Sequence, residues 1–266
     1  MGDCYLEGVG VTQDYGKAIS HWLVAAEQGF AMAQRALGTL YFVGIGLQQD
    51  KSSAAMWYRK AAEQGDALAQ VELGRCYDRG WGVAEDKEEA IQWYRKAAEQ
   101  DEPKALCEVG EYYLRDGSTD KNPEEALRWL RKAADLGDSM GQWWLGTMYA
   151  RGEGVSVDKQ EAVKWYRKAA DQGLAGAQNA LAMCLDNGEG VPQNKASAAM
   201  WYRKAAEQGH AVALFNLGVC FEEGDGVPKD REEAMKWYRQ AAKLGVHDAD
   251  ERLRQLGKKF RLPFGR

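Results

Sequence analysis

Long hydrophobic runs, a basic excess and an even number of cysteines are all missing from this sequence. No apolar stretch approaches the roughly 20 residues that a membrane-spanning helix needs, and the sequence as given does not begin like a signal peptide. Its 35 basic residues are interleaved with 40 acidic ones, for a net charge of −5. The sequence therefore has no evident basic stripe of the kind that binds nucleic acid. We therefore expect no membrane span and no nucleic-acid partner, whereas the compartment stays open.

Proline is scarce, with five residues among 266, whereas tryptophan recurs with a fixed period of 36 residues. An Ala-Ala pair follows the same period from residues 25–26 to residues 241–242. A fixed period of this length indicates a repeat architecture, and it defines seven units without an insertion. His21 takes the tryptophan position in the first unit and is expected to lie in the core. The tryptophan column is Trp57, Trp93, Trp129, Trp165, Trp201 and Trp237.

Each unit is predicted to contain two helices. The second begins at Asp or Asn, whose side chain accepts hydrogen bonds from the free N–H groups of a helix start. It ends at a glycine, which favours the left-handed conformation of a helix end. Asp101 replaces that glycine once, and Asp tolerates the same conformation. The starting column is Asp14, Asp50, Asp86, Asn122, Asp158, Asn194 and Asp230, and the ending column is Gly29, Gly65, Gly137, Gly173, Gly209 and Gly245.

The first helix of a unit has an apolar stripe with helical spacing, such as Ala69, Leu73 and Tyr77. A glycine column beside the stripe, which includes Gly74, is expected to let the partner helix approach closely. A Gly-x-Gly-Val turn joins the two helices in most units, and residues 116–119 replace it in the fourth. Phosphate-binding loops of similar composition follow strands, so we do not expect a phosphate site here.

These motifs resemble the Sel-one-like repeat (SLR) family, a relative of the tetratricopeptide repeats. The resemblance rests on Ala-x-x-x-Leu-Gly-x-x-Tyr, Gly-x-Gly-Val and Ala-x-x-Trp-Tyr-Arg-Lys-Ala-Ala-x-x-Gly, and covers essentially the whole chain. It implies an all-α fold, a right-handed α-solenoid superhelix of 36-residue helix-turn-helix repeats whose first helices line a concave face. It also implies an adaptor or scaffold role, as in many bacterial members.

The repeats set the expected domain organisation. Residues 1–245 are predicted to form seven repeats, the first truncated at its N-terminus because Met1 aligns with Leu37. The sequence leaves open whether the chain is a fragment of a longer protein. Residues 246–266 are predicted to form a capping helix and tail, because Ala249 continues the apolar stripe among charged residues.

Catalytic and metal-binding patterns are not found in the sequence. Four of the five cysteines share one column, and stacked helices lie roughly 8–10 Å apart, beyond the reach of a disulfide. We expect small buried thiols; the within-repeat pairing of the family's cysteine-rich branch is absent, which leaves the hydrolytic or penicillin-binding activity of that branch in doubt. No spacing of His21, His210 and His247 suggests a metal site. We expect no enzyme activity, no metal and no cofactor. The cysteine column is Cys4, Cys76, Cys184 and Cys220.

A basic column runs along the second helices and could be a ridge for nucleic acid or anionic lipid. Acidic residues stand four positions further on, within helical pairing distance, so a solvated face is the better interpretation. The column is Arg59, Arg95, Arg131, Arg167, Arg203 and Arg239.

First-helix positions outside the apolar stripe are expected to face the concave side, among them Val71 and Cys107. Trp143 and Trp144 lie outside the structural tryptophan column, and Trp and Arg dominate binding hot spots. The alternative is that Trp143 or Phe215 fills space between adjacent first helices. Trp81 is a further exposed candidate at the rim. The predicted partner-binding residues are Met140, Trp143, Trp144, Arg75, Asn179, Met183, Phe215 and Asn216.

The sequence therefore predicts a non-catalytic scaffold that binds a protein or peptide on its concave face. A specific inhibitor of one effector, of the immunity type, is the second hypothesis. An enzyme acting on cell-wall or β-lactam compounds and a designed array without a natural partner are weaker alternatives.

Overall fold

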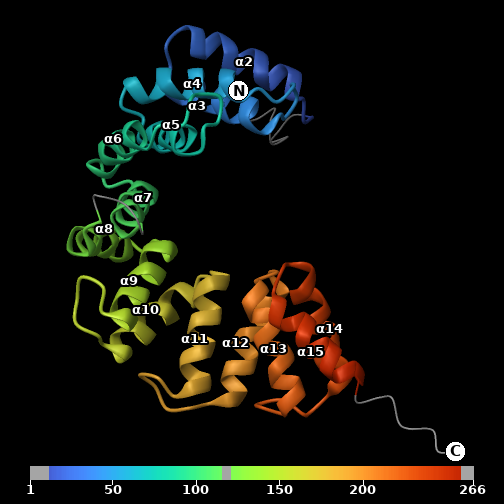
Figure 1. Ribbon diagram of the computed structural model, residues 1–266. Helices are drawn as coiled ribbons and strands as arrows, with labels where there is room; N and C mark the ends of the chain where they lie inside the picture. The colour runs from blue at the N-terminus through green and yellow to red at the C-terminus, as the bar shows by residue number, and fades with distance from the viewer. Residues whose placement is uncertain (1–11, 116–120, 259–266) are drawn as a thin grey trace, which may run out of the picture. The chain divides into compact units, whose positions relative to one another are not determined.

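The computed structural model describes residues 12–115 and 121–258, which fold into helices without strands (Figure 1). The predicted turn at residues 116–119 and the aligned start at Met1 lie outside the described residues. The helices, in chain order, are α2 (Tyr15–Glu27), α3 (Ala31–Val43), α4 (Lys51–Glu63), α5 (Ala67–Arg79), α6 (Lys87–Ala98), α7 (Pro103–Leu114), α8 (Pro123–Asp135), α9 (Ser139–Arg151), α10 (Lys159–Asp171), α11 (Ala175–Asn187), α12 (Lys195–Glu207), α13 (Ala211–Glu223), α14 (Arg231–Lys243) and α15 (His247–Lys258).

The chain divides into two compact units, unit 1 (Met1–Ala133) and unit 2 (Ala134–Arg266). We call the first helix of each repeat helix A (α3, α5, α7, α9, α11 and α13) and the second helix B (α4, α6, α8, α10, α12 and α14). Within each unit, helices that follow one another along the chain pack against each other, as α11 to α14 do in Figure 1. This stacking confirms the predicted all-α solenoid.

The ends of the B helices are formed as predicted. The side chains of the Asp and Asn column accept hydrogen bonds from the first backbone N–H groups, as Asp86 does from Glu89 at 2.9 Å. Glycines with φ between 81° and 94° end the helices, and Asp101 takes their place with φ 62°. The repeat boundaries therefore follow from local backbone chemistry.

The glycine column allows the close approach that we predicted. A Cβ atom added at Gly74 would lie 2.6 Å from the ring of Tyr94 on α6. Gly218 has the same relation to Tyr238 on α14, also at 2.6 Å. Since real Cβ atoms do not approach a ring so closely, glycine lets the tyrosine of helix B lie flat on helix A.

The tryptophan column forms part of the core, with Trp57, Trp93, Trp165 and Trp201 between 6% and 9% exposed. A lysine three residues later covers each ring, with its Nζ 3.8–4.3 Å from the ring centroid. His21 does not follow the column, because its side chain is exposed. Trp57 packs with Ala26 of the preceding repeat. For His21 on α2, the residues that come before this helix lie mostly outside the described part of the chain.

Three arginines of the basic column, Arg59, Arg95 and Arg203, pack on aromatic rings. Arg59 lies 5.5 Å from the ring centroid of Tyr77, and Arg203 lies 5.5 Å from that of Phe221. In each case the ring belongs to the A helix of the next repeat. These arginines therefore join successive repeats through their planar faces.

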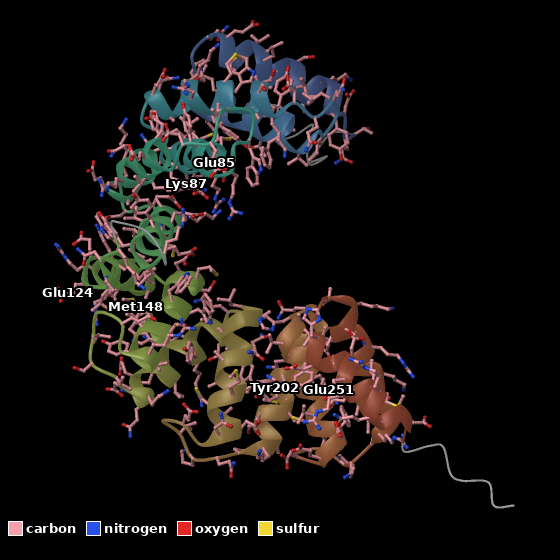
Figure 2. The ribbon with its side chains drawn as sticks, viewed as in Figure 1. Glu85, Lys87, Glu124, Met148, Tyr202 and Glu251 are labelled. Atoms are coloured by element: carbon pink, nitrogen blue, oxygen red, sulfur yellow. The ribbon has the colours of Figure 1, made fainter. Side chains whose placement is uncertain are left out.

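The first lysine of several B helices forms ion pairs near the inter-helix turn. Lys87 begins α6 and pairs with Glu85 and Asp78 at 3.1 Å each (Figure 2). Burial alone would raise the pKa of Asp78, but Lys87 and Arg115 outweigh burial and lower that pKa. Lys195 pairs in the same way with Asp186, at 2.8 Å.

Buried glutamines link three successive helices. Gln34 on α3 donates to the carbonyl of Ala26 on α2, at 3.0 Å, and accepts from Gln64 after α4, at 2.7 Å. Three further pairs repeat this arrangement: Gln70 with Gln100, Gln142 with Gln172, and Gln178 with Gln208. The two remaining positions of this kind have leucine at both partners, Leu106 with Leu136 and Leu214 with Leu244.

The described cysteines are free thiols, as predicted, and Cys4 lies outside the described residues. Cys76, Cys107 and Cys220 are buried, whereas Cys184 is half-buried. Burial raises the pKa of Cys76 and Cys220 to about 12 and that of Cys184 to about 11. These thiols therefore remain protonated at neutral pH.

Candidate functional site

Seven of the eight predicted binding residues belong to unit 2, on three A helices. Arg75 lies on α5 in unit 1. The others are Met140, Trp143 and Trp144 on α9, Asn179 and Met183 on α11, and Phe215 and Asn216 on α13.

The two tryptophans of α9 stack on each other, with ring centroids 4.8 Å apart and ring planes tilted by 57°. Both are half-buried. The Trp143 ring lies against Gly176 on α11, 3.7 Å from the place of an added Cβ. Trp143 thus fills space between adjacent A helices, as the alternative interpretation held, while its ring still reaches the surface.

A pocket of about 460 Å³ lies between α9 and α11. Four of the predicted residues line it, namely Trp143, Trp144, Asn179 and Met183. Tyr166 lines the pocket from α10, and its hydroxyl donates to Thr147 on α9 at 3.3 Å. The pocket therefore has rigid aromatic walls.

Asparagine side chains connect α11 with α13. The amide of Asn216 donates to the amide oxygen of Asn179, at 3.3 Å, and Asn179 donates to the sulfur of Met183, at 3.5 Å. Asn179 is only 8% exposed, whereas Met183 is 44% exposed. The sequence therefore placed Met183 at the surface correctly, and Asn179 serves largely to hold it there.

Phe215 lies on α13, the last of the three A helices that contain the predicted binding residues. Its ring packs on Tyr238, with centroids 5.4 Å apart. Phe215 also lines a shallow polar hollow between α13 and α15 with Glu251 (labelled in Figure 2), Asp248 and Arg252.

Three of the residues predicted to be exposed are packed. Val71 is fully buried and Cys107 is 5% exposed. Trp81 is half-buried against Phe42, with centroids 5.0 Å apart, beneath Lys51. For Val71 and Cys107 the reason is that their column lies next to the following A helix, where small apolar side chains become enclosed.

Arg75 is held by two carboxylates. It pairs with Glu72 on its own helix at 3.2 Å and with Glu108 on α7 at 2.9 Å. Desolvation alone would lower the pKa of Arg75, but the two carboxylates raise it. Its predicted role in partner binding would require these ion pairs to break.

The polar pocket residues Lys159, Glu189 and His210 are among those that were not predicted from the sequence. Lys159 begins α10 and pairs with Glu189 in the turn after α11, at 3.0 Å. His210 precedes α13, where its Nδ1 accepts from the N–H of Ala213 at 3.2 Å, and burial lowers its pKa. The one signal for Lys159 is the recurrence of lysine directly after the Asp or Asn column.

Metal and membrane features were searched over residues 12–115 and 121–258. No group of three or more His, Cys, Asp or Glu side chains is arranged to hold a metal ion there. None of the helices in these ranges is both long enough and apolar enough to cross a bilayer.

The stacked helix pairs, capped by Asp or Asn and closed by glycine, define an α-solenoid repeat protein. The Sel1 repeat pattern matches seven consecutive segments: 1–30, 31–66, 67–102, 103–138, 139–174, 175–210 and 211–246. The chain therefore belongs to the Sel1 repeat family, whose repeats form a protein-interaction scaffold and are generally non-catalytic.

Several solved structures resemble the chain. A Sel1 repeat protein from Oxalobacter formigenes is 35% identical, with a TM-score of 0.81, over 90% of this chain and 96% of that one. A protective antigen of uropathogenic Escherichia coli with an SLR fold is 36% identical, with a TM-score of 0.77, over 97% of this chain. The matched region spans 56% of that antigen.

A more distant structure is an immunity protein from Pseudomonas aeruginosa. It is 26% identical, with a TM-score of 0.57, over 86% of this chain and 88% of that one. No curated protein sequence matches the chain.

Proposed function

We propose that this chain is a non-catalytic scaffold that binds one partner protein or peptide on the A helices of unit 2. The observation that supports this most directly is the pocket between α9 and α11, which the stacked pair Trp143 and Trp144 lines together with Met183. Trp143 also packs on Gly176, but neither tryptophan belongs to the structural column on the B helices, and both rings are half-buried at the pocket. Aromatic side chains at a pocket supply large, rigid contact areas for a partner.

Affinity capture from a lysate of the source organism tests this proposal. Wild type is compared with the Trp143→Ala/Trp144→Ala variant, with circular dichroism to show that both are folded. A Phe42→Ala/Trp81→Ala variant is the matched control, because these rings also stack in a tilted arrangement, at 5.0 Å, but in unit 1. We expect a partner that the wild type and the control capture and the Trp143→Ala/Trp144→Ala variant loses. Equal capture by all three proteins would refute the site.

A second candidate function is specific inhibition of one effector protein. It is favoured by the likeness to two immunity proteins of Pseudomonas aeruginosa, 25% and 26% identical. If this is correct, the captured protein should stop cell growth when it is produced alone, and coproduction of this chain should restore growth. A captured protein that is harmless when produced alone would contradict the inhibitor function and favour the adaptor function.

A further inference from the structure

The two units differ in charge at equivalent positions of their A helices. Counted from the helix start, positions 2, 5, 6 and 9 are those at which the candidate residues lie, from Met140 to Thr147 on α9. We call these positions of α9, α11 and α13 the A face of unit 2. None of its residues is charged. The same positions of α3, α5 and α7 contain Arg35, Glu72, Arg75, Lys104, Glu108 and Glu111.

Apolar side chains, two of them flexible methionines, are exposed along the A face of unit 2. Met140 on α9 is 36% exposed, Met183 on α11 is 44% exposed and Val212 on α13 is 47% exposed. Methionine adapts its shape to irregular apolar surfaces and is frequent at protein-binding sites. One such residue on each of the three helices gives a partner apolar contacts across the whole face.

Charged residues near the pocket are already paired. Lys159 contacts Glu189 at 3.0 Å, and Arg151 contacts Glu153 at 3.7 Å. A partner charge placed at the pocket between α9 and α11 would therefore lose water without gaining an unpaired counter-ion, which is costly, whereas the charged Asp248 and Glu251 of α15 lie at the far end of the face, beside Phe215. The electrostatics thus select against charged segments.

Asn216 offers hydrogen bonds that suit a peptide backbone. Its one bond to Asn179 uses a single amide hydrogen, whereas an asparagine side chain has two donor hydrogens and an acceptor oxygen. Asn216 is half-buried, so these groups lie beside the apolar contacts rather than in bulk water. A main-chain peptide group would satisfy them without bringing a charge.

We propose that the A face of unit 2 binds an uncharged, apolar segment of the partner, with one bulky side chain in the pocket between α9 and α11 and a main-chain peptide group at Asn216. This inference rests on the function proposed above and specifies the chemistry of the partner. The pocket, of about 460 Å³, accommodates a side chain such as methionine, leucine or phenylalanine.

Selection from a displayed random peptide library tests this chemistry. The full-length chain is the target, and peptides that also bind the Trp143→Ala/Trp144→Ala variant are removed. Enriched peptides are then synthesised, and their affinity is measured by fluorescence anisotropy at about 0.05 and about 0.5 M NaCl, which changes the screening length severalfold. Met183→Glu is compared with Met183→Leu, and Met56→Glu, at an exposed methionine on α4 in unit 1, is the control.

We expect enriched peptides that lack charged residues in their central positions and bind equally at both salt concentrations. Met183→Glu should weaken their binding by about tenfold or more, since it places an unpaired charge against apolar groups. Met183→Leu should leave the affinity within about threefold, because a leucine conserves the apolar contact, and Met56→Glu should do so because Met56 lies on α4 in unit 1.

Two other outcomes would overturn the inference. Peptides that need Trp143 and Trp144 but are charged and bind weakly at high salt would leave the site in place and refute the uncharged partner. Failure to enrich any peptide that depends on the two tryptophans would refute both the uncharged partner and the site of the proposed function.

Discussion

At the residue scale, the fifth position of each A helix shows how one place in the repeat serves different purposes. Its side chain lies next to the following repeat, where Trp143 covers Gly176 and Arg35 pairs with Asp66 at 3.0 Å. Val71 is short enough to be enclosed completely. A large side chain at this position both closes the gap between helices and extends to the surface, which is why Trp143 has a structural and a candidate binding role.

Replacing the two kinds of tryptophan should separate these roles. Trp165 is 8% exposed and lies beneath Lys168, so Trp165→Ala should lower the free energy of unfolding by about 3–5 kcal/mol through the cavity it leaves. The half-buried Trp143 should cost about 1–2 kcal/mol when changed to alanine. Urea denaturation followed by circular dichroism measures both. Equal losses would contradict the assignment of Trp143 to a surface position.

Thiol reactivity should follow burial. Because burial raises the pKa of Cys76 and Cys220 to about 12, almost none of either thiol is ionised at pH 8, and only the thiolate reacts. In a Cys4→Ser background, Ellman's reagent should leave both residues unmodified in the native protein and modify all four cysteines in denaturant. Cys184, with a pKa of about 11 and a half-buried side chain, should react first. Rapid native reaction of Cys76 would show that the repeat opens.

At the element scale, the helix limits could be predicted because each depends on one residue type. Aspartate begins a helix, as at Asp86, and glycine allows a close approach of two helices, as at Gly74. Both residue types recur at the same position of the repeat, so they can be recognised in the sequence. The glutamine pairs were missed because their partners stand 30 residues apart, as with Gln34 and Gln64, and this spacing is not the repeat period. The sequence feature that links the two glutamine columns is that both are replaced by leucine together, at Leu106 with Leu136 and at Leu214 with Leu244.

A double-mutant cycle measures how much the pair Gln142 and Gln172 contributes to stability. Gln142→Leu removes the acceptor of Gln172 and a donor to Ala134, so it should cost about 1–3 kcal/mol of unfolding free energy. Adding Gln172→Leu should recover part of that loss, since Leu106 with Leu136 shows that the fold accepts two leucines. Thermal and urea unfolding of the four proteins gives the coupling energy. Strict additivity would show that the glutamine pair is incidental.

The last helix is proposed to act as the cap of the solenoid. On α15, Ala249 is fully buried and Leu256 is 5% exposed, while Gln255 beside it is exposed. Leu256→Asp should therefore destabilise unit 2 by about 2–5 kcal/mol, through lost burial and an unpaired charge, whereas Gln255→Asp should change little. Hydrogen exchange of α13 and α14 measures the effect locally. Unchanged exchange in Leu256→Asp would exclude a capping role.

At the scale of the whole molecule, the fold was more predictable than the site. Core positions recur from repeat to repeat, so columns such as the tryptophans can be recognised in a single sequence. The candidate binding face uses each position once, and its surroundings depend on neighbours that differ between repeats. Asn179 illustrates this, because its amide group contacts Asn216 on the next A helix as well as Met183 on its own helix.

Stability should likewise spread only between neighbouring repeats. The most extensive helix contacts within each unit run between consecutive helices, and side-chain contacts such as Arg75 with Glu108 join the A helices of neighbouring repeats. In such an array the energy is a sum of repeat and nearest-neighbour terms. Tyr166, beside Trp165, belongs to the same core cluster as Trp201 of the next repeat. Tyr166→Ala and Trp201→Ala should therefore couple by about 0.5–3 kcal/mol, as sites in one core cluster do.

Trp57→Ala and Trp201→Ala are the matched comparison, because four repeats separate these positions. Their effects on the free energy of unfolding should add to within about 0.5 kcal/mol. Guanidinium unfolding of the single and double variants measures both pairs, and tryptophan fluorescence is replaced by circular dichroism because each variant removes a fluorophore. Equal coupling in the two pairs would mean that the chain unfolds as one cooperative block, and the nearest-neighbour description would then fail for this protein.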